Sequence, residues 1–486
     1  MWNLSKMFMR TRTVRFASRI SALLLLTVLS TGVLRAQASF DVNQQLSPEQ
    51  LIADVDFYLK TLEEAHANPY AQISAKEFRA RADEIKSRIR RQGAMTQKEF
   101  WLLFTRLVSA IQDSHSYVVD PRFFVKPEDD TTKYFPLRTV YIDGKIVVTA
   151  SFADEKIEKG AVIEAINGTS SKELIRKISE HRFGVERERV ESAVLWLWVG
   201  AAEIFGRPSE FTVTFADGRK VQVRGLRLPE FIARENAARS ANPSAAKNNS
   251  PLELKLLDGG VAYLNSTTFE YDLEEYRALL KDVFTQIRSS GVERLIIDLR
   301  NNTGGNSALG DALIGMFNSK PYRHYSMRWK RSVQYVEEMK RKKTPLPDNY
   351  LALRPGEMLS GESQVVRPGD NPLRFKGRVY VLSSKETFSS GQMFLAVVKD
   401  NGLAKVIGEE NNEPVCSYGE VFFFNLPNSR LRTSLSVKYF TPPAGCKDAR
   451  GVVPDIPVKR RVADYVTGRD AILEATLNLI KREGDN

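Results

Sequence analysis

The sequence is poor in the residues that build disulfide scaffolds and metal sites. It has two cysteines and four histidines in 486 residues, too few for a disulfide-rich fold or a four-cysteine zinc site. No H-E-x-x-H or other metal-binding pattern is present, so we expect neither a metal nor a cofactor. A disordered composition is also absent, because hydrophobic residues make up 42% of the chain and charged residues 27%. A globular chain of this length is expected to form two or three domains.

Positive charge is concentrated at the N-terminus. The formal net charge is +12, but residues 1–38 hold six basic residues and no acidic one, and without them the charge falls to +6. A charge of this size is modest for such a long chain. We therefore expect no nucleic-acid partner.

The first 38 residues are typical of a secretory signal peptide. Residues 1–19 are basic, residues 20–34 are apolar, and Ala36 and Ala38 place small residues before a cleavage site after Ala38. The apolar run is shorter than the roughly 20 residues that span a bilayer. An uncleaved N-terminal anchor is the alternative interpretation. We expect a periplasmic or secreted protein with no stable membrane insertion after cleavage.

Three helix starts indicate an N-terminal helical domain, which we place at residues 45–115. Ser47, Ser74 and Thr96 are each followed three residues later by Gln or Glu, the pattern of a capping box. Apolar residues at helical spacing follow each of these positions.

The pattern becomes β-rich between residues 116 and 236. Asp143-Gly144 and Asp217-Gly218 are typical of hairpin turns. Between them, residues 157–168 read I-E-K-G-A-V-I-E-A-I-N-G, and Ser170 would cap the helix that follows. Strand, turn, strand and capped helix resemble the middle of a PDZ-like module, which binds extended chain ends by adding a strand to a sheet. An ordinary hairpin is the alternative.

Residues 237–251 are small and polar, and we predict a linker there. Strands and helices then alternate over residues 252–486, as they do in α/β proteins. Five elements are expected, namely strands at 261–264, 294–299 and 379–382 and helices at 273–289 and 390–399. The sequence therefore predicts an α/β domain over residues 252–486.

Two loops of this domain are candidates for chemistry. Residues 301–305 follow a predicted strand, and their two glycines would leave backbone amides free to face a ligand; a tight turn is the alternative. Ser389 lies at the start of a predicted helix, where free amides stabilise negative charge, although a helix cap is the simpler interpretation. His115, where the helical region ends, is the best-placed histidine to act as a base. The other histidines have no such setting: His66, His181 and His324.

Six segments, taken in order, resemble one family of serine peptidases. They are D-S-H-S at 113–116, K-G-x-x-I-x-x-I-N-G at 159–168, D-L-R-N-N-T-G-G at 298–305, T-F-S-S-G-Q at 387–392, K-D-N-G-x-A-x-x-I-G-E at 399–409 and G-V-V-P-D-I at 451–456. Together they resemble the tail-specific (carboxy-terminal processing) and tricorn proteases. The resemblance implies a crotonase-like α/β catalytic domain, a PDZ-like domain and hydrolysis of peptide bonds in a polypeptide substrate.

The resemblance also implies roles for individual residues, with Ser389 as the nucleophile. The processing proteases pair this serine with a Lys, but Pro414 stands at that position, 25 residues after Ser389. The tricorn branch instead uses a His preceded by a Ser, which Ser114-His115 matches. It also uses a Glu, and Asp448 stands at the matching position. By this resemblance His115 is the general base and Asp448 orients it.

The same resemblance implies that backbone amides hold the oxyanion, those of Gly304 or Gly305 and that of Ser390. Asp455 competes with Asp448 for the carboxylate role, and we assign Asp455 a structural one.

The two cysteines flank a predicted hairpin. Cys416 and Cys446 lie outside two β-rich runs at 421–426 and 431–439, so both fall near the open end of the hairpin. In an oxidising compartment they would form a disulfide. Two buried free thiols are the alternative.

These features predict an exported serine endopeptidase that recognises substrate C-termini through its PDZ-like domain. A catalytically inactive peptide- or ligand-binding protein on the same scaffold is the alternative. A polysaccharide hydrolase has little support, because no convincing pair of carboxylates for that reaction is evident in the sequence.

Overall fold

A computed structural model describes residues 43–128, 130–240, 250–447 and 449–484. All of them belong to one compact unit, Asp41–Asn486. The predicted signal peptide, most of the predicted linker and Asp448 lie outside the described residues. Within the described ranges, no helix is both long enough and apolar enough to cross a membrane.

Three helices form the N-terminal region, and each begins where the sequence predicts. They are α2 (Pro48–Ala65), α3 (Ala75–Gln92) and α4 (Gln97–Ser109). Ser47, Ser74 and Thr96 all form the predicted capping boxes, which satisfy backbone amides that would otherwise lack partners. The short strands β1 (Gln45–Leu46) and β2 (Met95–Thr96) pair beside them.

The β-rich region is built on one antiparallel sheet with the order β4-β5-β6-β8-β9. Its strands are β4 (Leu137–Ile142), β5 (Lys145–Ser151), β6 (Val162–Ile166), β7 (Thr169–Ser170, paired with β6), β8 (Glu210–Phe215) and β9 (Lys220–Arg224). Asp143-Gly144 and Asp217-Gly218 form the predicted turns, and Ser170 accepts the amide of Glu173 at the start of α5. The predicted order of strand, turn, strand and capped helix is confirmed locally.

Four helices accompany this sheet: α5 (Ser171–Ser179), α6 (Glu186–Leu195), α7 (Leu197–Ile204) and α8 (Leu228–Ser240). Nearby lie η1 (Pro121–Phe124) and the pair formed by β3 (Lys133–Tyr134) and β10 (Leu226–Arg227). Helix α8 continues to Ser240, so the first four residues of the predicted linker are helical. Buried Phe231 stacks on Trp198 and anchors this helix, a contact that linker composition cannot indicate.

A six-stranded sheet forms the α/β region in the order β11-β12-β13-β18-β19-β22. Its strands are β11 (Leu252–Leu257), β12 (Val261–Ser266), β13 (Arg294–Asp298), β18 (Arg378–Ser383), β19 (Lys405–Gly408) and β22 (Ile456–Pro457). All neighbouring pairs are parallel except β11 with β12. The predicted α/β fold class is confirmed.

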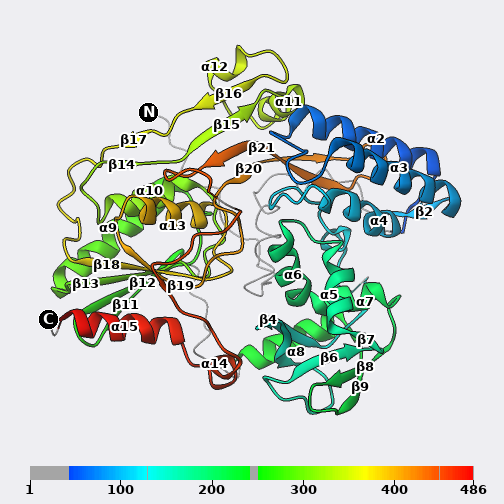
Figure 1. Cartoon of the computed structure of the whole chain (residues 1–486), viewed down its shortest axis with the longest axis horizontal. Helices are drawn as coiled ribbons and strands as arrows, with labels where there is room; N and C mark the ends of the chain where they lie inside the picture. Colours follow the sequence, from blue (N-terminus) through cyan, green and yellow to red (C-terminus); the bar gives the residue numbers. More distant parts are fainter. Residues whose placement is uncertain (1–42, 129, 241–249, 448, 485–486) are drawn as a thin grey trace, which may run out of the picture. The chain divides into compact units, whose positions relative to one another are not determined.

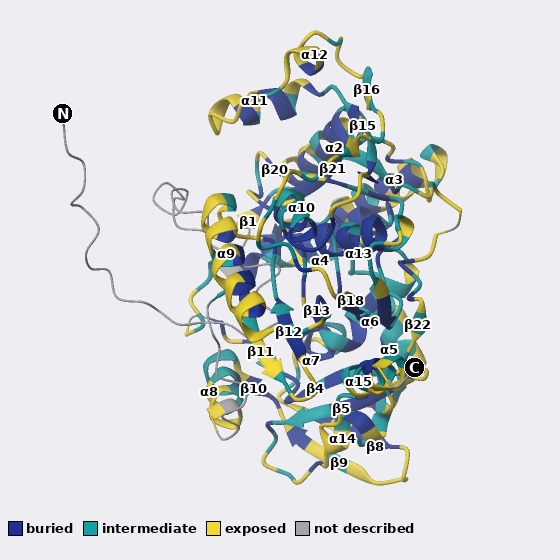
Figure 2. Ribbon diagram, turned by 90° about the vertical axis from the view of Figure 1, so that its left-hand side faces the viewer, coloured by how far each residue is buried: buried dark blue, intermediate teal, exposed yellow. Residues whose placement is uncertain are grey.

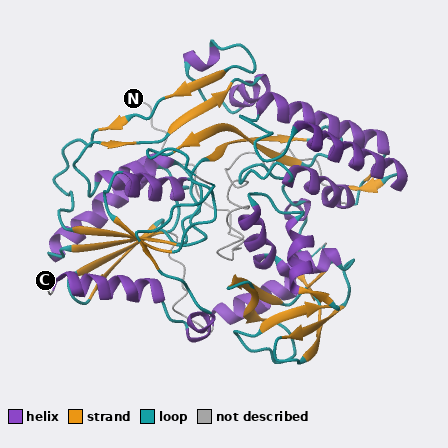
Figure 3. Ribbon diagram, viewed as in Figure 1, coloured by secondary structure: helices purple, strands orange, loops and turns teal. Residues whose placement is uncertain are grey.

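Helices cover both faces of this sheet, as Figure 1 and Figure 3 show. Helices α9 (Leu273–Ser290), α10 (Ser307–Gly315) and α13 (Ser390–Asp400) lie on one face, and α15 (Ala471–Gly484) lies on the other. Side chains alternate between the two cores along β13, where Leu295 and Ile297 join one and Ile296 the other. In Figure 2 the central strands are buried, whereas much of α9 is exposed.

A second antiparallel sheet has the order β16-β15-β21-β20. It contains the predicted hairpin, formed by β20 (Ser417–Asn425) and β21 (Arg432–Thr441), with β15 (Ser326–Lys330) and β16 (Met358–Gly361). The structure pairs Cys416 with Cys446 in a disulfide at the open end of this hairpin. The remaining elements are β14 (Tyr322–Arg323), β17 (Val365–Val366), α11 (Val333–Arg341), α12 (Asp348–Leu351) and α14 (Val462–Thr467).

Candidate active site

Three adjacent parallel strands end at one edge of the α/β sheet, and each runs into a loop of the candidate site. Strand β13 leads into residues 299–305, β18 into residues 384–389 and β19 into residues 409–416. The carboxyl ends of parallel strands share one edge of a sheet, and ligands bind there in open α/β folds. This edge therefore brings together segments that lie far apart in the sequence.

Ser389 directly precedes α13 and holds a rare backbone conformation. Its φ is 52° and its ψ is −126°, a region that residues with a side chain seldom adopt. Its side chain makes no capping hydrogen bond to α13, so the hydroxyl is not used as a helix cap. Such a conformation persists only where the surroundings impose it, and it is concentrated at functional sites.

The segment that carries His115 is held by β21. Ser434 donates its hydroxyl to the backbone carbonyl of His115 at 2.8 Å, and it accepts the amide of Tyr117 at 3.1 Å. Asp113 accepts the amide of His115 at 3.0 Å and also the hydroxyl of Ser116. The hairpin of the second sheet thus fixes the histidine loop on one side.

A buried histidine supports the same loop. His66 is fully buried, and its Nδ1 accepts the amide of Asn68 at 3.0 Å. This leaves the proton on Nε2, which lies 3.1 Å from Asp113 Oδ2 and donates to it. Burial opposes the charge on Asp113, but the hydrogen bonds from His66 and Ser116 outweigh burial and hold its pKa below the usual range. No motif around His66 predicts this role.

His115 and Ser389 meet although 274 positions separate them in the chain. The Nε2 atom of His115 lies 3.1 Å from the Oγ of Ser389, which is hydrogen-bonding distance. The ring of Phe388 stacks on the imidazole with the centroids 4.9 Å apart. Burial lowers the pKa of His115, so its neutral form, which can accept a proton, predominates at neutral pH.

Glu413 is a buried carboxyl that contacts both of these residues. Its Oε2 accepts the amide of Ser389 at 2.5 Å, and its Oε1 lies 3.8 Å from Nδ1 of His115. Among the described residues, neither that Oε1 nor that Nδ1 has a hydrogen-bond partner. Burial and then the charge of Glu188 raise the pKa of Glu413 well above its usual value.

The glycine loop lies directly against Ser389. Gly304 has φ +94°, and a Cβ added to it would lie 2.7 Å from the Cβ of Ser389. The amide of Gly304 donates to Asn302 Oδ1 at 2.9 Å. For the amides of Gly305 and Ser390 the described residues supply no acceptor, so these two are free to bind an anion. Ser390 also donates its hydroxyl to the carbonyl of Gly305 at 2.6 Å.

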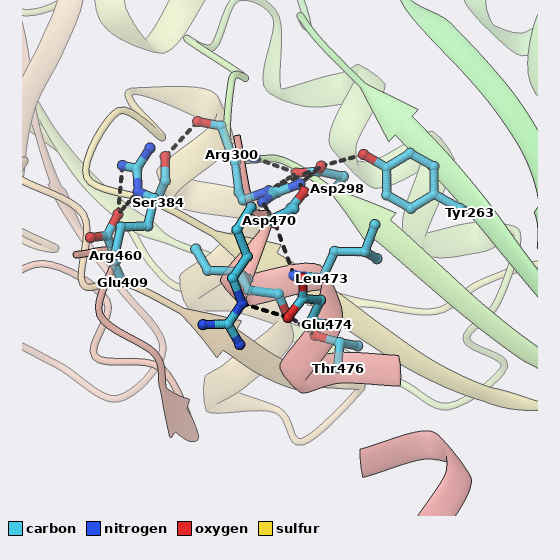
Figure 4. A network of polar contacts seen from close by, with 12 residues as sticks. Tyr263, Asp298, Arg300, Ser384, Glu409, Arg460, Asp470, Leu473, Glu474 and Thr476 are labelled. Carbon is cyan, nitrogen blue, oxygen red and sulfur yellow. Dashed lines mark hydrogen bonds and ion pairs between the residues drawn. The ribbon is translucent and has the colours of Figure 1, made fainter. Parts of the chain in front are cut away.

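An ion-pair network, drawn in Figure 4, holds Arg300 in the same strand-end loop that carries Gly304. Arg300 is held by Asp298, at 2.7 Å, and by Asp470, at 2.6 Å. Ser384 donates to the carbonyl of Arg300 at 2.6 Å, which ties the loop after β18 to the loop after β13. Tyr263 donates its hydroxyl to Asp298 at 2.5 Å. We name this set of side chains the Arg300 network.

The remaining sequence candidates fall outside the cluster or outside the described residues. Asp448 is not among the described residues, so its role stays a prediction. Asp455 accepts the amide of Val406 at 2.8 Å and pairs with Lys399, which is a structural arrangement. His181 contacts Thr105, and His324 pairs with Asp311 at 3.2 Å.

Two carboxyls near His115 were not among the sequence candidates, Glu413 and Glu188. Glu413 had an available signal, because it directly precedes Pro414, in a stretch that we considered only for a Lys. Glu188 has no distinctive sequence context. It lies on α6, and it accepts the hydroxyl of Ser114 at 2.7 Å.

Comparison with known proteins bears on the region that carries Ser389. The model of peptidase family S41 matches residues 260–458. Among curated proteins, no sequence matches this chain.

Solved structures of low sequence identity share the fold. Mature CPAF is 16% identical with a TM-score of 0.61, and the match covers 90% of this chain and 97% of that one. A complex of mature CPAF with lactacystin is 17% identical with a TM-score of 0.59 and covers 90% and 99%. The photosystem II D1 C-terminal processing protease is 14% identical with a TM-score of 0.42 and covers 84% and 93%.

Residues 260–458 thus match peptidase family S41, and the chain is a serine-type peptidase. The family match includes Ser389 and both strand-end loops beside it. The resemblance to the tail-specific proteases noted from sequence motifs is confirmed.

Proposed function

We propose that this chain is an exported serine endopeptidase in which Ser389 is the nucleophile and His115 the general base. The observation that carries the proposal is the 3.1 Å contact between His115 Nε2 and Ser389 Oγ. It joins a neutral imidazole to a hydroxyl that is held in a strained backbone conformation. A chance contact between two such distant segments would not be expected to have these properties.

The reaction begins when Ser389 Oγ attacks the carbonyl carbon of a peptide bond. The proton of Ser389 passes to Nε2 of His115 as the new C–O bond forms. The imidazolium then gives this proton to the leaving amine nitrogen as the C–N bond breaks. Water hydrolyses the resulting ester, with His115 accepting a proton from that water and returning it to Ser389.

Backbone amides at the start of α13 and in the glycine loop bind the oxyanion. Those of Gly305 and Ser390 are the favoured donors, because the amide of Gly304 already donates to Asn302. Gly304 instead allows the loop to approach Ser389 as closely as it does. The dipole of α13 adds positive potential at the same position.

Two carboxyls are proposed to align the catalytic pair, Asp448 and Glu413, and mutation can distinguish their contributions. Asp448 is proposed from the sequence as the carboxylate that orients His115. Glu413 holds the amide of Ser389 and faces Nδ1 of His115, which supports a part in aligning the two residues. Asp448→Asn and Glu413→Gln measured side by side assign the roles, because loss of the orienting carboxylate lowers kcat by about 10⁴-fold.

Substrate recognition is proposed for the β-rich region, which we interpret as PDZ-like. An extended peptide C-terminus would add to an exposed edge of the sheet that runs from β4 to β9. A peptide with a free C-terminal carboxylate should then compete with substrate better than its amidated form. Equal competition by the two peptides would remove C-terminal recognition from the proposal.

Export is proposed from residues 1–38, and the disulfide between Cys416 and Cys446 supports an oxidising compartment. N-terminal sequencing of the protein recovered from the cell envelope or the medium should find a chain that begins at Ser39. A chain that still begins at Met1 would favour the uncleaved anchor.

The decisive experiment is labelling by a fluorophosphonate, which reacts with activated serines. The mature protein should be labelled at Ser389, and Ser389→Ala should abolish both labelling and peptide hydrolysis. His115→Ala should lower both and leave the fold intact by circular dichroism. A protein that folds and binds peptides but is neither labelled nor active would support the alternative, an inactive binding protein.

A further inference from the structure

Glu188 is a half-buried glutamate whose carboxyl contacts the histidine loop. It lies in the first turn of α6, in the β-rich region of the chain. Ser114 donates its hydroxyl to Glu188 Oε2 at 2.7 Å, and the amide of Val185 donates to the same oxygen at 2.9 Å. Because Ser114 immediately precedes His115, this contact acts on the segment that carries the general base.

Helix α6 is itself fixed to the loops of the site. Arg187 pairs with Glu410 at 3.1 Å and donates to the backbone carbonyl of Asn412, the residue before Glu413. One turn further along, Glu191 pairs with Lys385 in the loop that leads to Ser389. Helix α6, which carries Glu188, is therefore fixed both to the loop that leads to Ser389 and to the loop that carries Glu413.

The turn before α6 packs directly against the side chain of Glu188. Gly184 has φ +91°, and a Cβ added there would lie 2.6 Å from Glu188 Oε2. The amide of Gly184 donates to the carbonyl of Asp113 at 3.1 Å. The loop before His115 is thus held through a backbone contact at Asp113 and a side-chain contact at Ser114, both made by the start of α6.

Holding a carboxyl at this position is unfavourable for the folded protein. Burial raises the pKa of Glu188 to about 7, and nearby Asp113 raises it further, while Ser114, Val185 and Arg187 lower it. The charge of Glu188 in turn raises the pKa of Glu413, which is a buried acid. Groups kept in such environments are concentrated at functional sites.

We infer that Glu188 is a positioning residue for peptide hydrolysis, which holds His115 against Ser389 by accepting the hydrogen bond of Ser114. The inference rests on the proposed function, because Glu188 acts only through the His115–Ser389 pair. It assigns a catalytic contribution to α6, which lies outside the 260–458 region matched by the family model.

The experiment compares Glu188→Ala with Glu188→Gln, using full-length mature protein, a fluorogenic peptide and a fluorophosphonate label. Glu188→Ala should lower kcat and the labelling rate by roughly 10- to 100-fold with KM nearly unchanged, because small displacements of a catalytic group have effects of this size. Glu188→Gln keeps an acceptor oxygen for Ser114 and should stay within about threefold of wild type. Glu186→Ala, an exposed position on the same helix, is the matched control and should behave as wild type.

A double-mutant cycle tests the route through Ser114. Ser114→Ala should reproduce the loss in Glu188→Ala, and the double variant should lose no more than either single one, because both remove the same hydrogen bond. Gly184→Ala displaces the carboxyl without removing it and should also lower kcat. If Glu188→Ala fails to fold, the kcat of Gly184→Ala tests whether the position of the Glu188 carboxyl affects catalysis.

Three results would overturn the inference: wild-type kcat in Glu188→Ala, additive losses in the cycle, or a Gln variant as slow as the Ala variant. These are distinguishable from failure of the proposed function. If Ser389 is not the nucleophile, the wild-type protein itself shows no Ser389-dependent labelling. If only the inference fails, the wild type is labelled and Glu188→Ala is labelled equally fast.

Discussion

Two polar clusters flank the same loop of this protein, and their electrostatics are opposite. At the active centre the acids Glu188 and Glu413 have raised pKa values and the base His115 has a lowered one, in each case chiefly because of burial. In the Arg300 network, burial also opposes charge, yet mutual hydrogen bonds keep the pKa of Arg300 above its usual value and that of Asp470 below. Around His115 the neutral forms of His115, Glu188 and Glu413 are favoured, and Asp113 is kept ionised by its hydrogen bonds. The Arg300 network favours the charged forms of Arg300 and Asp470.

The difference in pKa shifts indicates that the cluster around His115 is suited to proton transfer and the Arg300 network to structural support. As the proposed general base, His115 must be able to take up a proton, and burial keeps its imidazole neutral. A support must have one stable geometry, and the paired charges of the Arg300 network provide it. Arg300 and Gly304 belong to the same loop, residues 299–305, and Gly304 lies against Ser389, so the network that holds Arg300 helps to align this loop.

Removing the nucleophile should produce the largest effect, and only on activity. Ser389→Ala should lower kcat/KM by about 10⁴-fold or more, because the acyl-enzyme cannot form. Its Tm should not fall, since Ser389 makes no capping bond. Peptide hydrolysis and thermal unfolding measure the two quantities, with exposed Ser360→Ala as the control. A large loss of Tm would show that the active centre also carries stability.

A larger side chain in the glycine loop should produce the second-largest loss of activity. A Cβ at residue 304 would lie 2.7 Å from the Cβ of Ser389 and 2.8 Å from the amide nitrogen of Ser390. Gly304→Ala should therefore misplace the oxyanion donors and lower kcat by about 10²–10³-fold, the usual effect of losing one donor. Gly315→Ala, where the added Cβ meets nothing within 4 Å, is the matched control and should keep wild-type kcat.

Mutation of the Arg300 network should chiefly lower the free energy of unfolding. Arg300→Met leaves Asp298, which is 2% exposed, buried without its ion-pair partner. The free energy of unfolding should fall by about 3–5 kcal/mol, the usual effect of breaking a buried pair. Arg354→Met removes an exposed pair with Glu357 and should change it by less than about 1 kcal/mol. Equal effects in denaturant titrations would contradict the distinction between the clusters.

The smallest effect is the pH dependence, which should have opposite signs in the two clusters. The pKa of Glu188 is raised from 4.5 to about 7 in the folded protein, so its contribution to stability is lost as pH rises between these values. Glu188→Gln should remove that loss and be more stable than wild type at pH 8, by at most about 3 kcal/mol.

Asp470 should behave in the opposite way. Its pKa is lowered in the folded protein, because the hydrogen bond and charge of Arg300 outweigh burial, so its contribution is present above the unfolded pKa and is lost on acidification. Asp470→Asn should be less stable than wild type at neutral pH, and the difference should shrink as pH falls. Denaturant titrations across pH measure both variants, and a common sign for the two would refute the comparison.

Much of the fold was predictable from local patterns. The hydroxyls of Ser47, Ser74 and Thr96 act within one turn of their own helix, so the capping boxes could be read directly. The hairpin joined by the disulfide followed from the alternation of residues and from the even placement of Cys416 and Cys446 around it.

The candidate site was only partly predictable. Ser389 and His115 were identified because a motif carried each of them, and the structure brings their side chains together. Glu188 and His66 were missed, because nothing around them in the sequence distinguishes them from a surface acid or a helix-end histidine. Glu413 was missed because its stretch was searched only for a Lys. The linker prediction began four residues too early, inside α8, for the same kind of reason, since the contact of Phe231 with Trp198 is tertiary.

The sequence by itself determined the helix starts, the turns, the alternation of strands and helices in the α/β region and the two residues proposed for proton transfer. Tertiary structure decided which carboxyls face His115, that Gly304 no longer has a free amide, and that α6 reaches the site from another region of the chain. The physical reason is the distance along the chain over which each interaction acts. Caps and turns act over three or four residues, whereas burial and a hydrogen bond between residues 114 and 188 exist only once distant segments have packed.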